Sequence, residues 1–269
     1  MSALSLVLIT RNAASQLDAC LASARALVDD IVVLDSGSDD ATAAIAKRHG
    51  ARFVVQPFAG FGPQKHAAVA LARNDWVLCL DADERLTPEL AASIAAVLVQ
   101  PDCPAYRFNR RNRFFGRYLK HGEAYPDPCL RLFDRSRAHW SDDAVHEKVV
   151  VSHARIGHLR GDLLHDSAED LSSYLAKQNR YTDLQADALF AAGKRAGPGK
   201  LLLSPLTRFV RFYVFRLGFL DGAAGFAHIA IGSFFAFVKY AKLMARWRAV
   251  GEPAASPERG APTPGAKST

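Results

Sequence analysis

The segment from Trp76 to Glu84 constrains the fold most, because an apolar run ends abruptly in three carboxylates. The run from Trp76 to Leu80 has the composition of a buried strand, and Asp81, Asp83 and Glu84 follow it at once. Burying such charges without partners is costly. We therefore expect the carboxyl end of this strand to open into a site where Asp81 and Asp83 face a hard divalent cation, which in turn faces phosphate oxygens. Glu84 lies just ahead of a predicted helix start and is interpreted as a helix-start charge.

The preceding sequence alternates apolar stretches with helical patterns. Strands are predicted at residues 4–10, 30–35 and 52–56, and helices at residues 17–27, 42–49 and 64–73. This alternation is typical of an open parallel α/β sheet, in which ligands bind at the carboxyl ends of the strands. The sequence has neither G-x-G-x-x-G after the first strand nor a P-loop motif, which argues against a dinucleotide-binding domain and a P-loop enzyme.

Several motifs occur in a fixed order along the chain. They are Thr10-Arg11-Asn12, Asp35-Ser36-Gly37-Ser38-Asp39-Asp40, Gly60-Phe61-Gly62-Pro63-Gln64-Lys65, Asp81-Ala82-Asp83, Pro126-Asp127-Pro128, Arg131-Leu132-Phe133, Val145-His146-Glu147 and Arg216-Leu217-Gly218-Phe219-Leu220-Asp221-Gly222. Together they resemble family 2 glycosyltransferases, and over residues 1–248 they are similar to the bacterial lipopolysaccharide inner-core β-1,4-glucosyltransferase branch. The resemblance implies an α/β class with the Rossmann-like GT-A fold, a mostly parallel sheet flanked by helices, and a C-terminal hydrophobic and basic helical extension.

The resemblance also implies which residues contact the donor nucleotide. Thr10 and Arg11, at the end of the first strand, and Asp35, at the end of the second, are expected to bind the donor, with Thr10 and Asp35 meeting the base or ribose. The alternative for Thr10 is a simple turn residue. The alternative for Asp35 is a loop or capping carboxylate, although Ser38 and Asp39 are better placed to cap the next helix.

The remaining donor and metal residues follow the same resemblance. Lys65 is expected to reach the diphosphate and Asp81 the ribose, and Arg131 matches a basic residue of this branch; the alternative for Lys65 is a solvated surface charge. Asp83 is the expected direct ligand of Mg²⁺ or Mn²⁺. His165 is interpreted as a further metal or phosphate contact, with a structural hydrogen-bonding role as its alternative.

Sugar transfer also needs a base that deprotonates the acceptor hydroxyl. The resemblance places it near residues 142–147, and we favour Glu147 as the catalytic base with His146 as its neighbour or orienter. The usual Glu-Asp pair of the family is absent, so Asp142 and Asp143 remain alternatives. His146 and Glu147 could instead merely pair with nearby basic residues.

These expectations describe a hexosyltransferase that works by a single inverting displacement. The metal and Lys65 would absorb charge on the departing diphosphate while the base activates the acceptor hydroxyl. The resemblance implies UDP-glucose as donor and a lipopolysaccharide inner-core heptose, or another glycolipid, as acceptor. One alternative is a polyprenyl-phosphate glycosyltransferase, and another is a non-catalytic membrane-surface binding protein with the same fold.

Composition indicates a bacterial-type cytoplasmic enzyme at the inner-membrane surface. The 269 residues can bury a catalytic core, and Cys20, Cys79, Cys103 and Cys129 form no C-x-x-C pair and are interpreted as reduced core thiols. The amino terminus has no cationic leader, so its apolar run is interpreted as a strand. A net charge of +7 suits phosphate-rich lipids. No nucleic-acid recognition fold is visible, so nucleic acid is not an expected partner. The basic residues concentrate at Arg107, Arg110, Arg111, Arg113, Arg117, Lys120, Arg208, Arg211, Arg216, Lys239, Lys242, Arg246 and Arg248.

The carboxyl-terminal part changes character. We predict a catalytic domain at residues 1–199, a helical membrane-associated extension at 200–250, and a disordered tail at 251–269. Residues 222–238 carry no formal charge but are short for a spanning helix, which needs about 20 apolar residues. Helices lying in the cytoplasmic leaflet's interface are therefore expected, and a homo-oligomer interface or a lid is the alternative.

Overall fold

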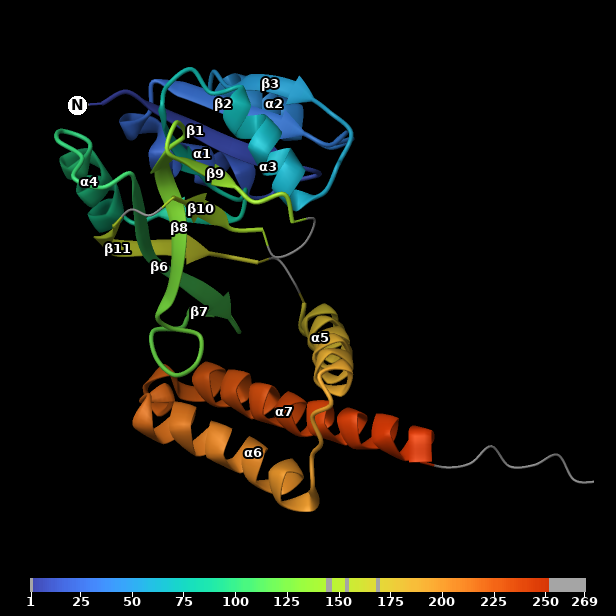
Figure 1. The fold of residues 1–269 in the computed structure, drawn as a ribbon. Coiled ribbons are helices and arrows are strands. Elements are labelled where there is room, and N and C mark those ends of the chain that lie inside the picture. Colours follow the sequence, from blue (N-terminus) through green and yellow to red (C-terminus); the bar gives the residue numbers. More distant parts are fainter. Residues whose placement is uncertain (1, 144–146, 153–154, 168–169, 252–269) are drawn as a thin grey trace, which may run out of the picture. The chain divides into compact units, whose positions relative to one another are not determined.

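The computed structural model describes residues 2–143, 147–152, 155–167 and 170–251 (Figure 1). The chain divides into two compact units. Met1–Glu169 and Phe212–Ile229 form the first, called here the sheet unit, and Asp170–Arg211 and Ala230–Thr269 belong to the second, called the helical unit. Each is described by itself.

The sheet unit is built on one mixed sheet. Among the described residues its strands are β1 (Leu4–Thr10), β2 (Asp30–Asp35), β3 (Arg52–Val55), β4 (Trp76–Cys79), β5 (Glu84–Leu86), β6 (Ala105–Phe114), β7 (Arg117–Tyr118), β8 (Asp127–Asp134) and β11 (Ile156–His165). The order is β3-β2-β1-β4-β8-β6-β11-β5, with β7 paired to β6. Strands β1 to β4 pair in parallel, β8 runs antiparallel to β4 and β6, and β11 is parallel to β6. The predicted α/β class, a sheet flanked by helices, is confirmed, but the sheet is mixed: its pairs among β1 to β4 are parallel, whereas β8 pairs antiparallel with β4 and β6, and β5 with β11.

Helices cover both faces of this sheet. They are α1 (Leu17–Ala24), extended by a 3₁₀ turn at Arg25–Leu27, then α2 (Thr42–Arg48), α3 (Phe61–Ala70) and α4 (Pro88–Val97). Helix α3 begins at Phe61, earlier than the predicted residue 64. Pro63 lies in its first turn, where a missing N–H costs no intrahelical hydrogen bond, so this proline does not delay the helix.

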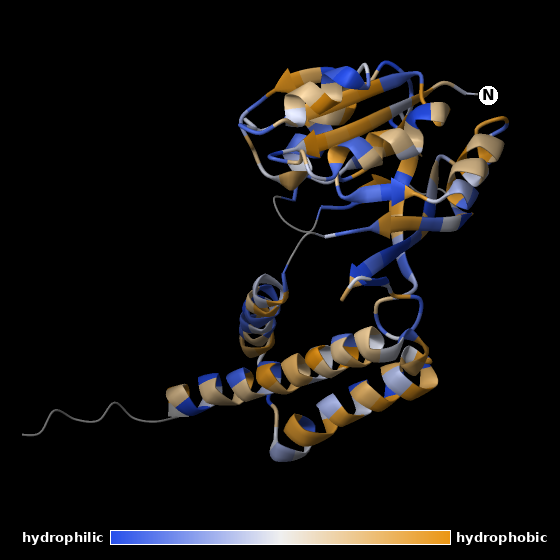
Figure 2. Ribbon diagram, turned by 180° about the vertical axis from the view of Figure 1, so that it is seen from behind, coloured by the Kyte–Doolittle hydropathy of each residue, from blue (hydrophilic) through white to orange (hydrophobic). Residues whose placement is uncertain are grey.

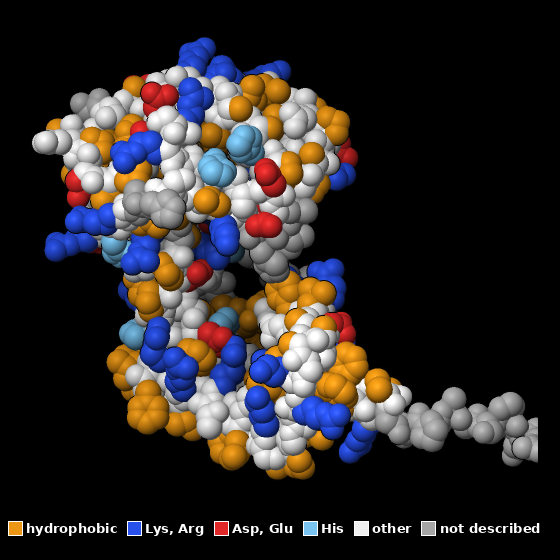
Figure 3. Space-filling view, in the orientation of Figure 1, with side chains coloured by type: hydrophobic (Ala, Val, Ile, Leu, Met, Phe, Trp, Pro, Cys, Tyr) orange, Lys and Arg blue, Asp and Glu red, His pale blue; other side chains and the backbone are white. Residues whose placement is uncertain are grey.

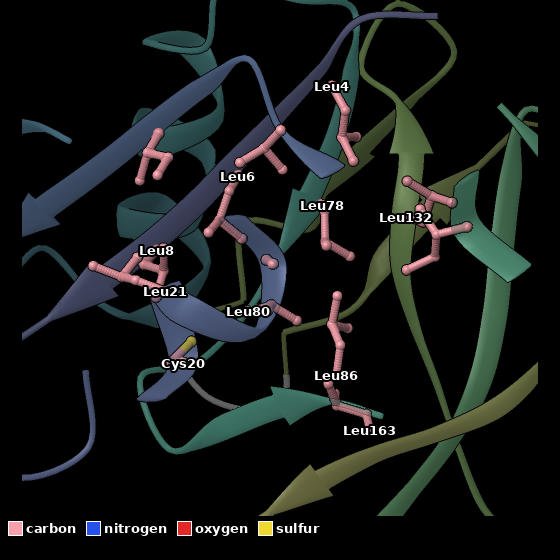
Figure 4. Packing of buried hydrophobic residues seen from close by; sticks show 14 of the residues in the cluster. Leu4, Leu6, Leu8, Cys20, Leu21, Leu78, Leu80, Leu86, Leu132 and Leu163 are labelled. Atoms are coloured by element: carbon pink, nitrogen blue, oxygen red, sulfur yellow. The ribbon is translucent and has the colours of Figure 1, made fainter. Parts of the chain in front are cut away.

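Alternation along β1 explains why both faces need cover. Leu4, Leu6 and Leu8 are fully buried in a cluster that includes Leu21 of α1 and Leu78 of β4, and Figure 4 shows them packed together. Side chains of a strand point alternately to its two faces, and Val7 joins a different cluster. That second cluster holds Ala68 and Val69 of α3, Val77, Phe133 of β8 and Trp140. Trp140 lies in a small separate sheet formed by β9 (Ala138–Trp140) and β10 (Val149–Val151).

A segment from late in the chain completes the sheet unit. It contains a π-helical turn (Arg211–Phe215), a 3₁₀ turn (Gly218–Asp221) and the first turns of α7 (Gly222–Gly251). The buried carboxylate of Asp221 accepts the backbone N–H groups of Lys120 at 2.9 Å and His121 at 2.8 Å. Gly218 has no room for a side chain, since a Cβ there would lie 2.2 Å from Ile229 Cδ1. The motif at Arg216 to Gly222 therefore fastens this segment to the loop after β7.

The helical unit consists of α5 (Leu171–Ala191), α6 (Pro198–Val210) and the remainder of α7. Basic side chains of α7 face carboxylates of α5: Lys242 Nζ lies 2.8 Å from Asp183 Oδ1, and Arg246 Nε lies 2.6 Å from Asp187 Oδ1. Figure 2 shows hydrophobic and hydrophilic residues interspersed along these helices. The predicted C-terminal hydrophobic and basic helical extension is confirmed.

Among the described residues, one helix at Gly218–Val250 is long and apolar enough to cross a membrane by length and composition. The uncharged run at residues 222–238 therefore lies within a longer helix, which continues through its basic positions. This is weak support for a membrane span, because the core helix of a soluble protein passes the same test.

Candidate active site

Two buried cations face the first carboxylate after β4. Asp81 Oδ2 lies 2.7 Å from Arg131 Nη2, and Asp81 Oδ1 lies 3.1 Å from Lys65 Nζ. Burial alone would raise the pKa of Asp81, but the positive charges of Arg131 and Lys65 outweigh it and hold that pKa well below its usual range. Asp81 is therefore a carboxylate throughout the physiological pH range, and its side chain remains about a third exposed.

Glu84 corrects one expectation. It is fully buried in β5, whereas α4 begins only at Pro88 after the N-cap residue Thr87, so its interpretation as a helix-start charge is wrong. Glu84 Oε1 lies 3.0 Å from Arg131 Nη2, and Oε2 accepts the N–H of Asp81 at 3.0 Å. A buried guanidinium needs a counter-charge, and Glu84 supplies it beside Asp81.

Arg131 is thus held by two carboxylates. Its side chain, in β8, is buried, and the negative charges of Asp81 and Glu84 outweigh desolvation and raise its pKa well above the ordinary value. The indole ring of Trp140 lies 5.7 Å from its guanidinium carbon. Trp140 was not singled out from the sequence, and Glu84 was interpreted only as a helix-start charge; the signal available for the ion pairs was the density of acidic groups after β4, which requires buried cations nearby.

Lys65 joins α3 to the candidate base. Its buried ammonium lies 2.8 Å from Glu147 Oε1 and 4.7 Å from the centre of the Trp140 ring. The alternative of a solvated surface charge for Lys65 is therefore wrong, because the side chain is only 9% exposed. The structure brings Lys65, Asp81, Arg131 and Glu147 together, from α3, β8 and two loops.

The other candidates for the catalytic base are not part of this buried cluster. Asp142 and Asp143 are exposed on the loop after β9, and His146 lies outside the described residues. This loop packs against the start of α3, where a Cβ on Gly62 would meet the carbonyl oxygens of Ser141 at 2.3 Å and Asp143 at 2.5 Å. Because Gly62 has no side chain, the loop after β9 can lie close to the start of α3, the helix that carries Lys65.

A second pair of side chains meets at the turn after β4. His165, at the end of β11, lies with Nε2 3.1 Å from Asp83 Oδ2, and both side chains are about a quarter exposed. A carboxylate and an imidazole are suitable ligands for a divalent metal ion. Within the residues that the structure describes, no cluster of three or more His, Cys, Asp or Glu side chains could enclose an ion.

A pocket of about 100 Å³ adjoins this pair. It is lined by Ser15, Gln16, Ala19, Ala82, Asp83, Arg85 and Asp166. Arg113 Nη1 lies 2.7 Å from Asp166 Oδ2, and Arg85 lies 3.8 Å from the same oxygen. The surroundings of Asp83 are therefore open, polar and of mixed charge.

The residues at the carboxyl ends of β1 and β2, Thr10 and Asp35, are more deeply buried than Asp81 after β4. Asp35 is buried, and its carboxylate accepts the N–H groups of Gly37 at 2.9 Å and Ser38 at 2.6 Å and the hydroxyl groups of Thr10 at 2.8 Å and Ser38 at 2.6 Å. These bonds outweigh burial and lower the pKa of Asp35. Helix α2 begins at Thr42, so Ser38 holds Asp35 and does not cap the helix. Arg11 is exposed.

Three of the four arginines of β6 are paired with carboxylates. Arg110 Nε lies 2.9 Å from Asp127, Arg111 is in direct contact with Asp162, and Arg113 pairs with Asp166. The expected attraction of phosphate groups to this stretch is thus reduced by internal pairing. In the surface view of Figure 3, Lys and Arg side chains are spread among other residue types.

The four cysteines are free thiols, as predicted. Cys20, Cys79 and Cys103 are buried, and Cys129 is partly buried. Burial raises the pKa of Cys79 to about 11 and that of Cys129 to about 12, so both are protonated at neutral pH.

Comparisons with known proteins agree with this architecture. A model of the family "Glycosyl transferase family 2" matches residues 5–158. The "Lipopolysaccharide core biosynthesis glycosyltransferase LpsC" of Rhizobium meliloti is 31% identical over 252 residues, covering 90% of this chain and 92% of that protein. An "Uncharacterized glycosyltransferase" of Rickettsia felis is 29% identical over 262 residues, with 90% of each chain covered.

The chain also resembles two solved structures. TarS 1-349 of S. aureus in complex with UDP superimposes with a TM-score of 0.47 at 14% identity, covering 94% of this chain and 93% of that chain. Glucosyl-3-phosphoglycerate synthase of Mycobacterium tuberculosis, in complex with Mn²⁺ and UDP, gives a TM-score of 0.35 at 26% identity over 42% of this chain and 44% of that chain. From the family match and the extent of the LpsC likeness, together with the mixed sheet described above, we conclude that this chain belongs to glycosyl transferase family 2 and is a glycosyltransferase with the GT-A fold.

Proposed function

We propose that this enzyme transfers glucose from UDP-glucose to a heptose of the lipopolysaccharide inner core, with inversion at the anomeric carbon. The likeness to LpsC, which is named for lipopolysaccharide core biosynthesis and is matched over nine-tenths of its length, supports the acceptor class. The donor and the inversion follow from the motif resemblance of the sequence.

One observation carries the proposal: Asp83 Oδ2 lies 3.1 Å from His165 Nε2. Two residues earlier, the carboxylate of Asp81 is paired with the cations Lys65 and Arg131. The antiparallel pairing of β5 with β11 sets His165 opposite Glu84 and so brings it beside Asp83, 82 positions away in the sequence. We assign them to hold Mg²⁺ or Mn²⁺. That ion would offset negative charge on the departing nucleotide diphosphate.

Glu147 is the proposed base. It would accept the proton of the acceptor hydroxyl as that oxygen attacks the anomeric carbon. Its contact with Lys65 fixes one carboxylate oxygen. Lys65 in turn lies between Glu147 and Asp81, where a positive charge can also stabilise the diphosphate as it departs.

The donor-binding residues divide into two groups in this proposal. Asp81 and Arg11, which are accessible, would contact the nucleotide directly. Thr10, Asp35 and Arg131 are buried and would act by holding the loops that shape the donor site.

We further propose that residues 200–250 attach the catalytic domain of residues 1–199 to the cytoplasmic face of the inner membrane. Helix α6 supports this, since Leu202 is 65% exposed and Leu203 and Leu206 are each 58% exposed, while Arg208 lies at its end. An exposed apolar face with flanking basic groups is typical of interfacial helices.

Vesicle sedimentation tests the membrane proposal. Replacing Leu202, Leu203 and Leu206 together with serine should release the protein from anionic vesicles, because the inserted apolar area is lost. Leu184→Ser on α5, at a position that is 60% exposed, provides the control and should leave binding unchanged. Unchanged sedimentation of the triple variant would contradict the proposal and favour a homo-oligomer interface.

The donor is tested by thermal unfolding with UDP, GDP, ADP and dTDP, each with and without Mn²⁺. A ligand at about 100 times its dissociation constant adds about 2.7 kcal/mol to the free energy of unfolding. Stabilisation by UDP that requires Mn²⁺ supports the proposal, and preference for another nucleotide overturns the donor. Transfer assays with heptose-bearing lipid and with polyprenyl phosphate then decide the acceptor.

A further inference from the structure

The side chain of Asn112 contacts both His165 of the candidate metal site and the carboxylate of Asp127, which lies outside that site. Strands β6 and β11 are parallel neighbours, and their register places Asn112 directly beside His165. On the other side of β6, the antiparallel strand β8 begins at Asp127. Asn112 Nδ2 donates to Asp127 Oδ2 at 3.2 Å, and Asn112 Oδ1 lies 2.7 Å from His165 Nδ1.

These contacts determine the direction of each hydrogen bond. A carboxylate accepts only, so the amide nitrogen of Asn112 must face Asp127 and its oxygen must face the imidazole. The amide oxygen also accepts only, so the ring nitrogen Nδ1 of His165 carries a proton. Asp127 is itself held by Arg110, whose Nε lies 2.9 Å away, so the orientation is anchored in the sheet.

The other ring nitrogen then faces Asp83. In a neutral imidazole with its proton on Nδ1, Nε2 has a free lone pair, and here it lies 3.1 Å from a carboxylate oxygen of Asp83. Two electron-rich atoms at this distance are stable only with a positive charge shared between them, either a proton or a metal ion. Metal-binding histidines commonly donate their second N–H to an oxygen acceptor in this way, which fixes the tautomer and the ring orientation.

We propose that Asn112, oriented by Asp127, is a positioning residue that holds His165 with Nε2 presented to a divalent cation shared with Asp83. The inference rests on the proposed function, because it concerns the same cation. Asn112 acts only through His165, so its effect should disappear when His165 is absent.

The test measures Mn²⁺ affinity in the presence of UDP, from the electron paramagnetic resonance signal of free Mn²⁺. Asn112→Leu should weaken Mn²⁺ binding about 10- to 100-fold, as is usual when a supporting partner of a metal ligand is lost. Asn109→Leu makes the same chemical change on the same strand at a residue that contacts Tyr125, and should leave Mn²⁺ affinity unchanged. In a His165→Ala background, Asn112→Leu should have no further effect.

Nuclear magnetic resonance provides a readout that needs no turnover. In alkaline buffer with UDP and the diamagnetic ion Mg²⁺, two-bond ¹H–¹⁵N spectra should show His165, assigned by its absence in His165→Ala, with its proton on Nδ1 in the wild-type protein and redistributed toward Nε2 in Asn112→Leu. A proton on Nε2 in the wild type would overturn the inference, as would an equal loss of Mn²⁺ affinity caused by Asn112→Leu with and without His165.

The two proposals fail differently. If wild-type protein binds no Mn²⁺ with UDP, the metal assignment fails and the inference fails with it. If the wild type binds Mn²⁺ and Asn112→Leu binds it equally well, only the role of Asn112 is wrong.

Discussion

Strand β2 ends in Asp35, and Asp81 follows two residues after the end of β4 on the same side of the sheet, yet the two strand ends are built differently. At β2, the carboxylate of Asp35 accepts four hydrogen bonds from Thr10, Gly37 and Ser38 and is 1% exposed. At β4, Asp81 faces the cations Lys65 and Arg131, and Asp83 faces His165 near an open pocket.

The difference shows that a carboxylate at a strand end can be stabilised in two ways. Neutral donors from the loop after β2 and from Thr10 of β1 satisfy Asp35, and they leave it no free oxygen for a ligand without rearrangement. The cations Lys65 of α3 and Arg131 of β8 satisfy Asp81, and the imidazole of His165 in β11 faces Asp83. A phosphate or a metal ion can compete for such partners. We expect the residues at the β2 end to maintain the shape of the donor site, and those at the β4 end to bind the phosphate groups and the metal ion.

Arg131→Met should have the largest effect. It removes the guanidinium that neutralises Asp81 and Glu84, and loss of one partner of a buried ion pair costs about 3–5 kcal/mol. Chemical denaturation measures the loss in the free energy of unfolding. Adding Glu84→Gln should recover part of it, because one uncompensated charge disappears, and Arg137→Met, at an exposed position, should change little. Wild-type stability in Arg131→Met would show that the cluster does not stabilise the β4 end.

Asp83→Asn should lower turnover about a thousandfold while the protein stays folded. A few kcal/mol of charge stabilisation in the transition state are lost, and each 1.4 kcal/mol or so slows the reaction about tenfold. Transfer is measured at saturating Mn²⁺. Asp75→Asn, at the opposite end of β4 with a 75% exposed side chain, is the matched control. Intact transfer by Asp83→Asn would remove Asp83 from the proposed metal site.

Glu147→Gln should lower turnover about a hundredfold or more, the usual contribution of a general base, with donor binding retained. Rates and UDP affinity are measured for this variant beside Asp142→Asn and Asp143→Asn. Full turnover by Glu147→Gln would exclude it, and a larger loss in either aspartate variant would move the base to the exposed loop.

Asp35→Asn should have the smallest effect, a loss of about 1–2 kcal/mol in the free energy of unfolding at neutral pH, because charge-assisted hydrogen bonds become neutral ones. The pKa of Asp35 is lowered in the folded protein, so its stabilisation is present above the unfolded pKa of about 3.9 and is lost as the pH falls through the folded value. The difference in the free energy of unfolding between wild type and Asp35→Asn should therefore become smaller as the pH is lowered. Asp39→Asn on the same loop is the control, and a difference that became larger in acid would contradict the assignment.

Much of the fold was predictable because it follows from local patterns. The apolar stretches of β1, β2 and β4 and the helical spacing of α1 were read correctly to within a few residues. The pairing of carboxylates with cations was only partly predictable. Glu84 was wrongly interpreted as a helix-start charge because the start of α4 lies nearby in the sequence. Its actual partner, Arg131, lies 47 residues away and could not be inferred from the local pattern.

The sequence by itself determined the order of strands and helices, the family motifs and the positions of the carboxylates that follow β4, because periodicity and motif spacing are local properties of the chain. Only the tertiary structure decided which charges meet. Lys65 joins Asp81 and Glu147, and Asn112 joins Asp127 and His165, because the crossing of α3 over the sheet and the register of β6 with β8 and β11 bring distant positions together. Such register depends on the packing of whole strands, which no single segment encodes.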